Sequence, residues 1–265
     1  MSHETINTRE GLSLLKFKGA FDCLRHGFSL RHGGVSRPPY DTLNTGFHVG
    51  DEPAAVVENR RRLALALGYQ DVDVIAGQQV HGSVVAVVDG TMRGRGACSD
   101  KTALPATDGL VCCEPGVVLM CHAADCTILF FYDAVQRIIG LAHAGWRGAV
   151  AGIGLAMIDA MKELGSKPEN IHAALAPTIG PCCYRVGEDL AEQVPVRWRD
   201  RVLFGKLNQI YFDLPKLQHL LLSEAGIRDD KIIKSNFCTC CSGDKFFSHR
   251  GSGGHTGRMA AIISL

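Results

Sequence analysis

Apolar and polar residues alternate in short runs along much of the chain, and the clearest pattern spans residues 127–142. Two runs rich in β-branched and aromatic residues, 127–132 and 137–142, flank a short polar break at 133–136. Strand-forming runs separated by a few polar residues are typical of a β-hairpin. The pattern therefore predicts two antiparallel neighbouring strands at the centre of the chain.

The register of this hairpin predicts a pair of reactive side chains. With the midpoint of the turn between Ala134 and Val135, Cys126 and His143 lie at equal distances from the turn. Residues that face each other across an antiparallel pair have Cβ atoms roughly 4.5–5.5 Å apart. A thiolate and an imidazole at that distance suit a transition metal or a nucleophile–base pair.

Further elements follow from periodicity and from capping residues. Asp51 and Pro53 begin a helix that Gly68 ends, and a second helix begins at Asp213 with Pro215 and reaches Gly226. The third expected helix covers 148–164, and the expected strands are 83–89, 110–113, 116–121, 171–176 and 258–265. Strands in adjacent groups with helices between some of them indicate an α+β fold with mixed sheets. We expect one domain over residues 1–265.

Composition and charge exclude several classes of protein. Apolar residues make up 46% and charged residues 21% of the chain, which is typical of a globular protein. The net charge is +1 and no long basic run is present, so nucleic-acid binding is not favoured. The longest apolar runs are about eight residues, short of the ~20 that a membrane span needs. Residues 1–10 are polar and lack the apolar core of a signal peptide, so we expect a cytoplasmic protein.

Cysteine is unusually frequent, with 11 residues. An odd number without a secretion signal argues against a disulfide framework, so most thiols are expected to be reduced and buried. We expect the vicinal pair Cys182–Cys183 to be packing residues. Cys238 and Cys241 form a single Cys-x-x-Cys pair, for which a redox or structural-metal role is the minor alternative.

Candidate metal ligands are few and far apart in the sequence. His81 in a glycine-flanked turn joins Cys126 and His143 to give a His₂Cys set, which suits Zn²⁺ with an open fourth position. The same residues also suit metal-free catalysis, with Cys126 as nucleophile and His143 as its base. Both interpretations remain open at this stage.

Candidate substrate-binding residues lie in three segments. Arg147 stands in a glycine-flanked turn before the expected helix at 148, where free N–H groups and a guanidinium favour an anion. Asp125 either orients a histidine or caps the backbone. A glycine-rich, turn-dense tract near the N-terminus and an aromatic, basic stretch near the C-terminus supply the other candidates, which are Asn44, His48, Arg60 and Arg250.

These segments together resemble one family, the YfiH-type purine nucleoside phosphorylases, also known as laccase-domain or multicopper polyphenol oxidase-like proteins and as peptidoglycan editing factor. The similarity covers nearly the whole chain. The most specific motifs are Ala-Asp-Cys at 124–126 and His-Ala-Gly-Trp-Arg-Gly at 143–148. Other matching segments are 32–36, 43–51, 59–60, 79–82, 108–110, 115–116, 179–181, 246–248 and 256–260.

The resemblance implies a fold, a site and an activity. The fold is a β-sandwich layered between helices, a four-layer α/β/β/α arrangement. His81, Cys126 and His143 are the implied metal-site and catalytic residues, with zinc, or else copper, as the ion. The implied reaction is phosphorolysis of adenosine, inosine or 5′-methylthioadenosine, with adenosine deamination as a side activity. Phosphate would be held by Arg147, the helix start at Gly148 and Arg60, in a monomer or weak homodimer.

Alternatives come from different classes of protein. One is a cysteine hydrolase or amidase that acts on a peptidoglycan precursor through Cys126 and His143. Another is a copper-dependent polyphenol oxidase, which ranks low because multicopper oxidation needs many histidines, largely in His-x-His pairs. A metal-stabilised binding protein is the third. His122 stands about 13 Å along the strand direction from Cys126, and we interpret it as a packing residue or as a support behind the ligands rather than a fourth ligand.

Overall fold

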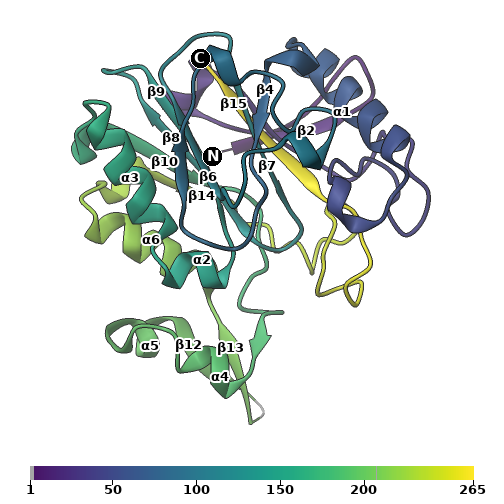
Figure 1. The fold of residues 1–265 in the computed structure, drawn as a ribbon. Coiled ribbons are helices and arrows are strands. Elements are labelled where there is room, and N and C mark those ends of the chain that lie inside the picture. The colour runs from purple at the N-terminus through teal and green to yellow at the C-terminus, as the bar shows by residue number, and fades with distance from the viewer. Residues whose placement is uncertain (1–2, 207) are drawn as a thin grey trace.

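Two six-stranded sheets face each other and carry helices on their outer faces (Figure 1). The computed structural model describes residues 3–206 and 208–265. The strand order is β1-β2-β3-β15-β7-β4 in the first sheet and β14-β10-β8-β9-β6-β5 in the second. Most pairs are antiparallel, but β4–β7, β5–β6 and β10–β14 are parallel, so both sheets are mixed.

The strands and helices are short. Strands of the first sheet are β1 (His3–Asn7), β2 (Ser13–Phe17), β3 (Arg25–Ser29), β4 (Val74–Ala76), β7 (Val118–Ala123) and β15 (Met259–Ser264). Strands of the second are β5 (Val85–Val87), β6 (Gly109–Cys112), β8 (Thr127–Asp133), β9 (Ile138–Ala144), β10 (Ile171–Leu175) and β14 (Ile232–Lys234). The α-helices are α1 (Pro53–Leu67), α2 (Trp146–Val150), α3 (Ile153–Glu163), α4 (Glu188–Ala191), α5 (Val196–Val202) and α6 (Leu214–Glu224).

Alternation along the strands separates the apolar layers. Phe130 of β8 packs with Phe28 of β3 in the core between the two sheets, whereas the next residue, Phe131, packs with Met157 of α3 on the outer face. A third cluster joins Leu63 of α1 to the outer face of the first sheet. Each buried aromatic or aliphatic side chain contributes about 1.5–3 kcal/mol. The predicted α+β class and the four-layer α/β/β/α arrangement are confirmed.

The predicted hairpin is present as β8 and β9, but its register differs from our expectation. His143 lies opposite Ile128, and Cys126 falls just before β8. The reason is Arg137, which adopts a left-handed backbone conformation (φ 54°) and delays the second strand by one residue. The pairing moves by two residues, which keeps Cys126 and His143 on the same face as diagonal neighbours.

Two of the predicted helices differ in detail, and the third is confirmed. The helix expected at 148–164 is broken at Gly152, whose φ of 87° is left-handed, so α2 and α3 are separate. Glu52, not Asp51, precedes α1, because the Asp51 carboxylate accepts hydrogen bonds from Ser36 and Asn44 instead. Asp213 caps α6 as expected, since its side chain accepts the N–H of Lys216.

A small sheet that the hydrophobic pattern did not indicate extends from one end of the sandwich (Figure 1). It consists of β11 (Arg185–Val186), β12 (Leu203–Lys206) and β13 (Gln209–Phe212), next to α4 and α5. The polar N-terminal stretch 1–10 forms β1, with residues 1 and 2 outside the described part. Within the described residues, no helix is both long and apolar enough to cross a bilayer.

The buried His26 is expected to make the folded protein less stable in acid. Its ring is buried, accepts the N–H of Phe17 at Nε2 and lies 3.2 Å from the Leu24 carbonyl at Nδ1. Burial lowers the pKa of His26 to about 4. As the pH falls from 6.5 towards 4, His26 becomes protonated in the unfolded chain but stays neutral in the folded chain. The free energy of unfolding therefore declines.

We expect the protonation of His26 in the unfolded chain to lower the free energy of unfolding by about 2 kcal/mol when the pH is changed from 7 to 5. Urea unfolding of the wild type and of His26→Gln at both pH values measures this. The variant is less stable at pH 7 but loses less stability on acidification. Equal losses in the two proteins would show that His26 is not the responsible group.

Candidate functional site

Three side chains of the ligand type converge at one end of the second sheet. His81 comes from the loop between β4 and β5, Cys126 directly precedes β8, and His143 lies in β9. Their ligand atoms all lie within 4.8 Å of one another, and the Cys126 Sγ is 3.8 Å from the His81 Nε2. The two imidazole rings meet edge to face, with centroids 4.8 Å apart. The expected convergence of the trio is therefore present.

Asp108 holds the two histidines of this group in place through hydrogen bonds. Its carboxylate, almost fully buried, accepts the N–H of His143 Nδ1 at 2.8 Å and the backbone N–H of His81 at 3.0 Å through Oδ1. Oδ2 accepts the N–H groups of Val80 and Gly82 at 3.1 and 2.9 Å. One carboxylate thus fixes the ring of one histidine and the backbone of the other. With Nδ1 of His143 bonded to Asp108, its Nε2 is the atom available to a ligand.

The electrostatics favour an ionised thiol. Burial raises the pKa of Cys126, but the neighbouring His143 and His81 outweigh this and bring the pKa down to about 6. Burial lowers the pKa of His143, but Cys126 and Asp108 outweigh this and raise it to about 9. Burial also works against ionisation of Asp108, yet its bonds to His143 and Gly82 leave its pKa lowered. These opposite shifts favour a thiolate at Cys126 beside a protonated His143 when no metal is bound.

Position 145, the glycine of the His-Ala-Gly-Trp motif, has no room for a side chain. A Cβ atom at this position would lie 2.8 Å from the ring of His81 and 3.0 Å from the Cys126 Sγ. Both contacts are shorter than carbon atoms tolerate, and both involve residues of the ligand group. The backbone therefore approaches the site more closely than any residue with a side chain permits.

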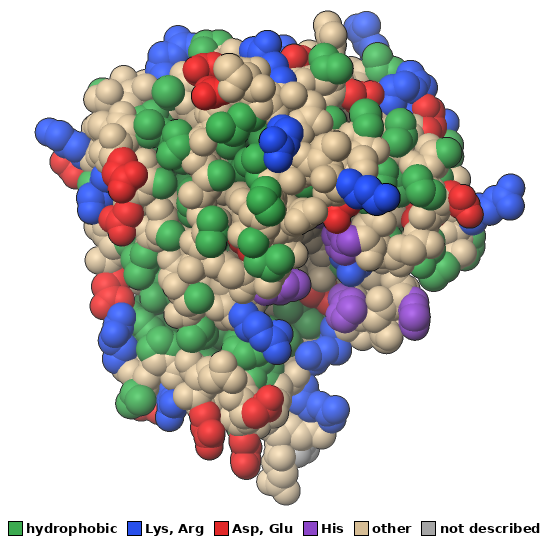
Figure 2. Space-filling model, viewed as in Figure 1, with side chains coloured by type: hydrophobic (Ala, Val, Ile, Leu, Met, Phe, Trp, Pro, Cys, Tyr) green, Lys and Arg blue, Asp and Glu red, His purple; other side chains and the backbone are tan. Residues whose placement is uncertain are grey.

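The group opens into a cavity of about 390 Å³. This volume lies within the range of small-molecule sites. Figure 2 shows histidine and basic side chains gathered around a hollow in this face of the molecule. Besides the ligand group, the polar and aromatic residues that line the cavity are His48, Gln79, His122, Asp125, Trp146, Arg147, Tyr184, His249, Arg250 and Arg258.

Four of the predicted substrate residues, His48, Asp125, Arg147 and Arg250, line this cavity. Arg147 lies over the Trp146 ring at 4.4 Å, and none of the described residues forms a hydrogen bond or an ion pair with its guanidinium. Arg250 donates from Nη1 to the Arg185 carbonyl at 2.8 Å. Burial lowers the pKa of His48 to about 4, so its ring is neutral at pH 7.

Asp125 lines the cavity but has no contact with either histidine. It adopts a left-handed backbone (φ 84°), and its carboxylate accepts bonds from the Thr239 hydroxyl and the Arg250 N–H, both at 2.6 Å. Of the two alternatives left open, capping the backbone is correct, and Asp108 is the carboxylate that orients a histidine.

Asn44 and Arg60 do not line this cavity. Asn44 is buried and hydrogen-bonded to Gly46, Asp51 and Arg258. Arg60 donates from Nε to the Thr45 carbonyl and from Nη1 to the carbonyls at 96 and 97. Both residues hold the N-terminal tract against the first sheet rather than face a substrate.

The expected helix start at Gly148 also differs. The five-residue α2 begins at Trp146 and ends before Gly152, so the expected long helix does not begin at Gly148. Side-chain positive charge at the cavity comes from its arginines. His122 is not part of the ligand group, because its Nε2 lies 2.7 Å from the Nη2 of Arg60.

Sequence reasoning did not assign several residues to the site, among them Asp108, Tyr184 and Arg258. Asp108 stood in a motif segment, but nothing in its local pattern distinguishes a buried carboxylate under a histidine from a turn residue. Tyr184 and Arg258 line the cavity from segments far apart in the chain. Only the folded arrangement brings them to the same wall.

The donor set fits a metal ion. Imidazole nitrogen and thiolate sulfur are preferred ligands of Zn²⁺ and also bind copper. Three donors within 4.8 Å, beside a cavity, leave one coordination position for water or substrate. The bond from Asp108 to His143 is the carboxylate support that metal-bound histidines commonly have.

Asp108→Asn tests the role of this support. An asparagine amide would turn its own N–H groups towards backbone N–H donors that bond to a carboxylate oxygen in the wild type. It would also bind the His143 ring less strongly. We expect zinc affinity to fall by about 10–100-fold, measured by competition with a chromophoric chelator. Asp125→Asn is the matched control, because Asp125 contacts neither histidine, and it should change zinc affinity little. Equal affinity of Asp108→Asn and wild type would contradict the assignment.

Known proteins resemble this chain over most of its length. The chain matches the family model for the multi-copper polyphenol oxidoreductase laccase over residues 25–265. It is 39% identical over 246 residues to purine nucleoside phosphorylase YlmD of Geobacillus stearothermophilus, which covers 89% of this chain and 88% of that protein. Adenosine deaminase RL5, from an unknown prokaryotic organism, is 31% identical over 236 residues, which covers 87% of this chain and 90% of that protein.

A solved structure shows the same fold. The crystal structure of the Bacillus licheniformis hypothetical protein YfiH superposes with a TM-score of 0.92 at 35% identity, covering 98% of this chain and 97% of that chain. The family match covers most of the sequence, and the identities extend over almost the full length of each relative. The chain therefore belongs to the family of the multi-copper polyphenol oxidoreductase laccase, the YfiH-type proteins.

Proposed function

We propose that this protein is an enzyme, a purine nucleoside phosphorylase with adenosine deaminase side activity. The substrates would be adenosine, inosine or 5′-methylthioadenosine with phosphate, and the products the base and a (thio)ribose 1-phosphate. The names of the relatives support this at the level of the family. One observation carries the proposal: the His81–Cys126–His143 group faces a cavity that also holds unpaired cationic charge.

Binding of phosphate falls to the arginines. Arg147 has its guanidinium in the cavity wall, and the Arg250 guanidinium retains donors besides the one bonded to the Arg185 carbonyl. A planar guanidinium matches a phosphate through paired hydrogen bonds. In phosphorolysis, a phosphate oxygen forms the new bond to C1′ as the base leaves. Catalysis then consists largely of positioning and electrostatic stabilisation.

Binding of the nucleoside falls to the aromatic and neutral polar residues. Tyr184 and the neutral His48 line the same cavity as the arginines. An uncharged ring offers one donor and one acceptor to a base or a ribose hydroxyl. Asp108 keeps the Nδ1 proton of His143, so the Nε2 side of that ring faces the reacting groups.

Zinc is the ion that we propose for the His₂Cys group, with copper as the alternative. When bound, zinc supplies Lewis acidity and lowers the pKa of water towards ~7, which is the chemistry of hydrolytic deamination at C6 of adenine. Only one of the two ligand groups found in 3–206 and 208–265 contains histidine, whereas multicopper oxidation needs several histidine-rich sites. Phosphorolysis therefore ranks above polyphenol oxidation.

The expectations on partners and location remain predictions of this proposal. We propose that the protein acts on small molecules in the cytoplasm as a monomer or weak homodimer, without nucleic acid or membrane. These statements rest on the sequence and on the names of the relatives.

A second candidate function rests on the order of three side chains. Asp108 bonds to His143, and His143 lies beside the low-pKa thiol of Cys126, as in a cysteine nucleophile, base and orienting acid. A hydrolase or amidase for a peptide such as a peptidoglycan precursor would use this arrangement without a metal. An alkylating reagent trapped on Cys126 in active, metal-free protein would favour it over phosphorolysis.

Phosphate-dependent release of adenine or hypoxanthine tests the leading proposal. We expect base release only when nucleoside and phosphate are both present, and a loss of about two orders of magnitude in His143→Ala. His255→Ala is the control, because His255 is exposed and does not line the cavity. Chromatography of the products measures both rates. Release that depends on neither phosphate nor His143 would refute the proposal.

Arg147→Gln tests the phosphate site. Loss of the charge should raise the KM for phosphate about 10-fold and change kcat less, because the interaction contributes mainly to binding. Arg201→Gln is the matched control, since Arg201 also lies over a tryptophan, Trp198, but outside the cavity. Initial rates over a range of phosphate concentrations provide both constants. An unchanged KM would exclude Arg147 from phosphate binding.

A further inference from the structure

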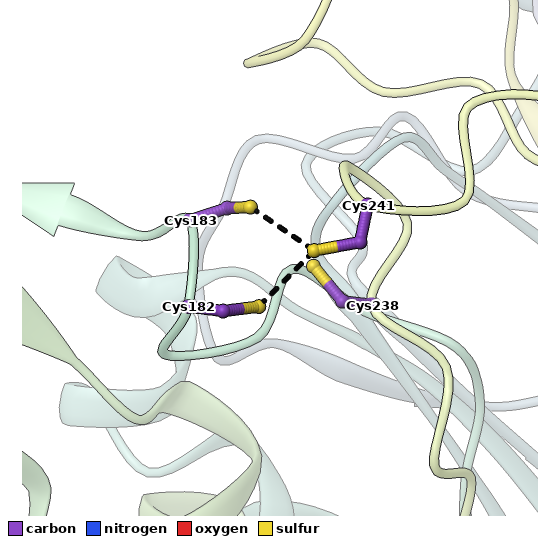
Figure 3. A group of neighbouring side chains, drawn as sticks. All are labelled: Cys182, Cys183, Cys238 and Cys241. Atoms are coloured by element: carbon purple, nitrogen blue, oxygen red, sulfur yellow. Dashed lines mark hydrogen bonds between the residues drawn. The ribbon is translucent and has the colours of Figure 1, made fainter.

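Four cysteines gather outside the cavity, at a place where the sequence predicted packing residues. The thiols of Cys182, Cys183, Cys238 and Cys241 have sulfur atoms that all lie within 4.8 Å of one another (Figure 3). Cys182 and Cys241 are exposed, and the other two are half-buried. The prediction that the Cys182–Cys183 pair serves only for packing is therefore wrong. We propose that these four thiolates form a second metal site, a closed tetrahedral zinc site.

The spacing of the sulfur atoms suits this geometry. The Cys241 Sγ lies 3.3 Å from the Cys182 Sγ and 3.4 Å from the Cys183 Sγ. Sulfur atoms around a tetrahedral zinc ion at ~2.3 Å are about 3.8 Å apart, and the two Cys241 distances are a few tenths of an ångström shorter than this. Disulfide bonding needs about 2.05 Å and would pair the sulfurs two by two. Cys241 approaches two other sulfur atoms rather than one, which differs from the pairwise contact of a disulfide.

Two distant segments deliver the ligands in a fixed relation. Cys182 and Cys183 follow β10 in a tight turn closed by the bond from the Cys183 N–H to the Gly180 carbonyl, at 3.0 Å. Cys238 and Cys241 follow β14 with the two-residue spacing of zinc ligands. An isolated parallel bridge between Thr178 and Cys238 pairs the two segments. The backbone holds the ligand pairs together without help from the metal.

A backbone donor to Cys238 and the space beside Gly180 suit a cluster of sulfur ligands. The Gly180 N–H donates to the Cys238 Sγ at 3.2 Å, and hydrogen bonds to a sulfur favour its anionic form. A Cβ at Gly180 would lie 3.3 Å from the Cys182 Sγ and from the Cys238 Cβ, so the absent side chain leaves room for the cluster. Four soft sulfur donors select zinc among common divalent ions, and four protein ligands leave no position for substrate.

The site would brace the wall of the cavity rather than catalyse. Tyr184, next to Cys183, lines the cavity, and Arg250 donates to the Cys183 carbonyl at 3.3 Å. Thr239, between Cys238 and Cys241, donates to Asp125, the neighbour of Cys126. A metal that joins the two cysteine segments therefore limits the motion of both residues at the wall.

Metal content of matched serine variants tests the proposal. Zinc equivalents per chain are measured by mass spectrometry on protein purified with a reductant, for Cys241→Ser and Cys240→Ser. Cys240 is the control, because it lies in the same turn but outside the group. We expect Cys241→Ser to contain one equivalent less than Cys240→Ser. The difference does not depend on the His81–Cys126–His143 group, so it is separable from the proposed function. Equal contents would overturn the site.

Alkylation of the wild type covers the case in which Cys241→Ser does not fold. Cys98 and Cys241 are both exposed in the structure. In zinc-loaded protein, iodoacetamide should modify Cys98 quickly and Cys241 only after a chelator is added, as read by peptide mass spectrometry. Equal rates at the two residues would overturn the proposal, as would a disulfide between Cys241 and either Cys182 or Cys183 in freshly reduced protein.

Discussion

The carboxylate of Asp108 is the constraint on which the site depends. It holds the backbone of residues 80–82 and the ring of His143 at the same time. Hydrogen bonds to a buried charged group contribute about 1.5–3 kcal/mol each, and a buried charge left without them costs more than an exposed one. If the loop with His81 moved away from β9, the buried Asp108 carboxylate would lose hydrogen-bond partners. The geometry of the ligand group is a consequence of the fold.

The second sheet brings this constraint next to one wall of the cavity. Cys126 and His143 lie at its strands β8 and β9, and the segments after its strands β10 and β14 supply the wall with Tyr184 and Arg250. Asp125 joins the two parts, because its carboxylate bonds to Thr239 and to the Arg250 backbone. In the described part of the chain, no carboxylate forms an ion pair with the arginines of the cavity, which suits the anion of the proposed function. The proposed cysteine site would reinforce the same wall.

Local pattern was sufficient to predict the hairpin β8–β9, helix α6 and the fold class, whereas the family resemblance supported the convergence of the three ligands. The predicted register of the hairpin was wrong because Arg137 adopts a left-handed backbone conformation, which the hydrophobic pattern does not indicate. Arg60 failed as a substrate residue, since only tertiary structure shows that its donors are used by carbonyl groups. The cysteine cluster escaped prediction because its ligand pairs are separated by more than fifty residues, and a bridge at Cys238 joins them.

Anomalous diffraction at the zinc absorption edge, from crystals of the protein loaded with zinc, tests the central claim most directly. The account predicts a strong peak between the His81 Nε2, the Cys126 Sγ and the His143 Nε2, with Asp108 still bonded to the His143 ring. A map in which those three side chains bind no ion, or in which the Asp108 carboxylate has left the histidine, would contradict it.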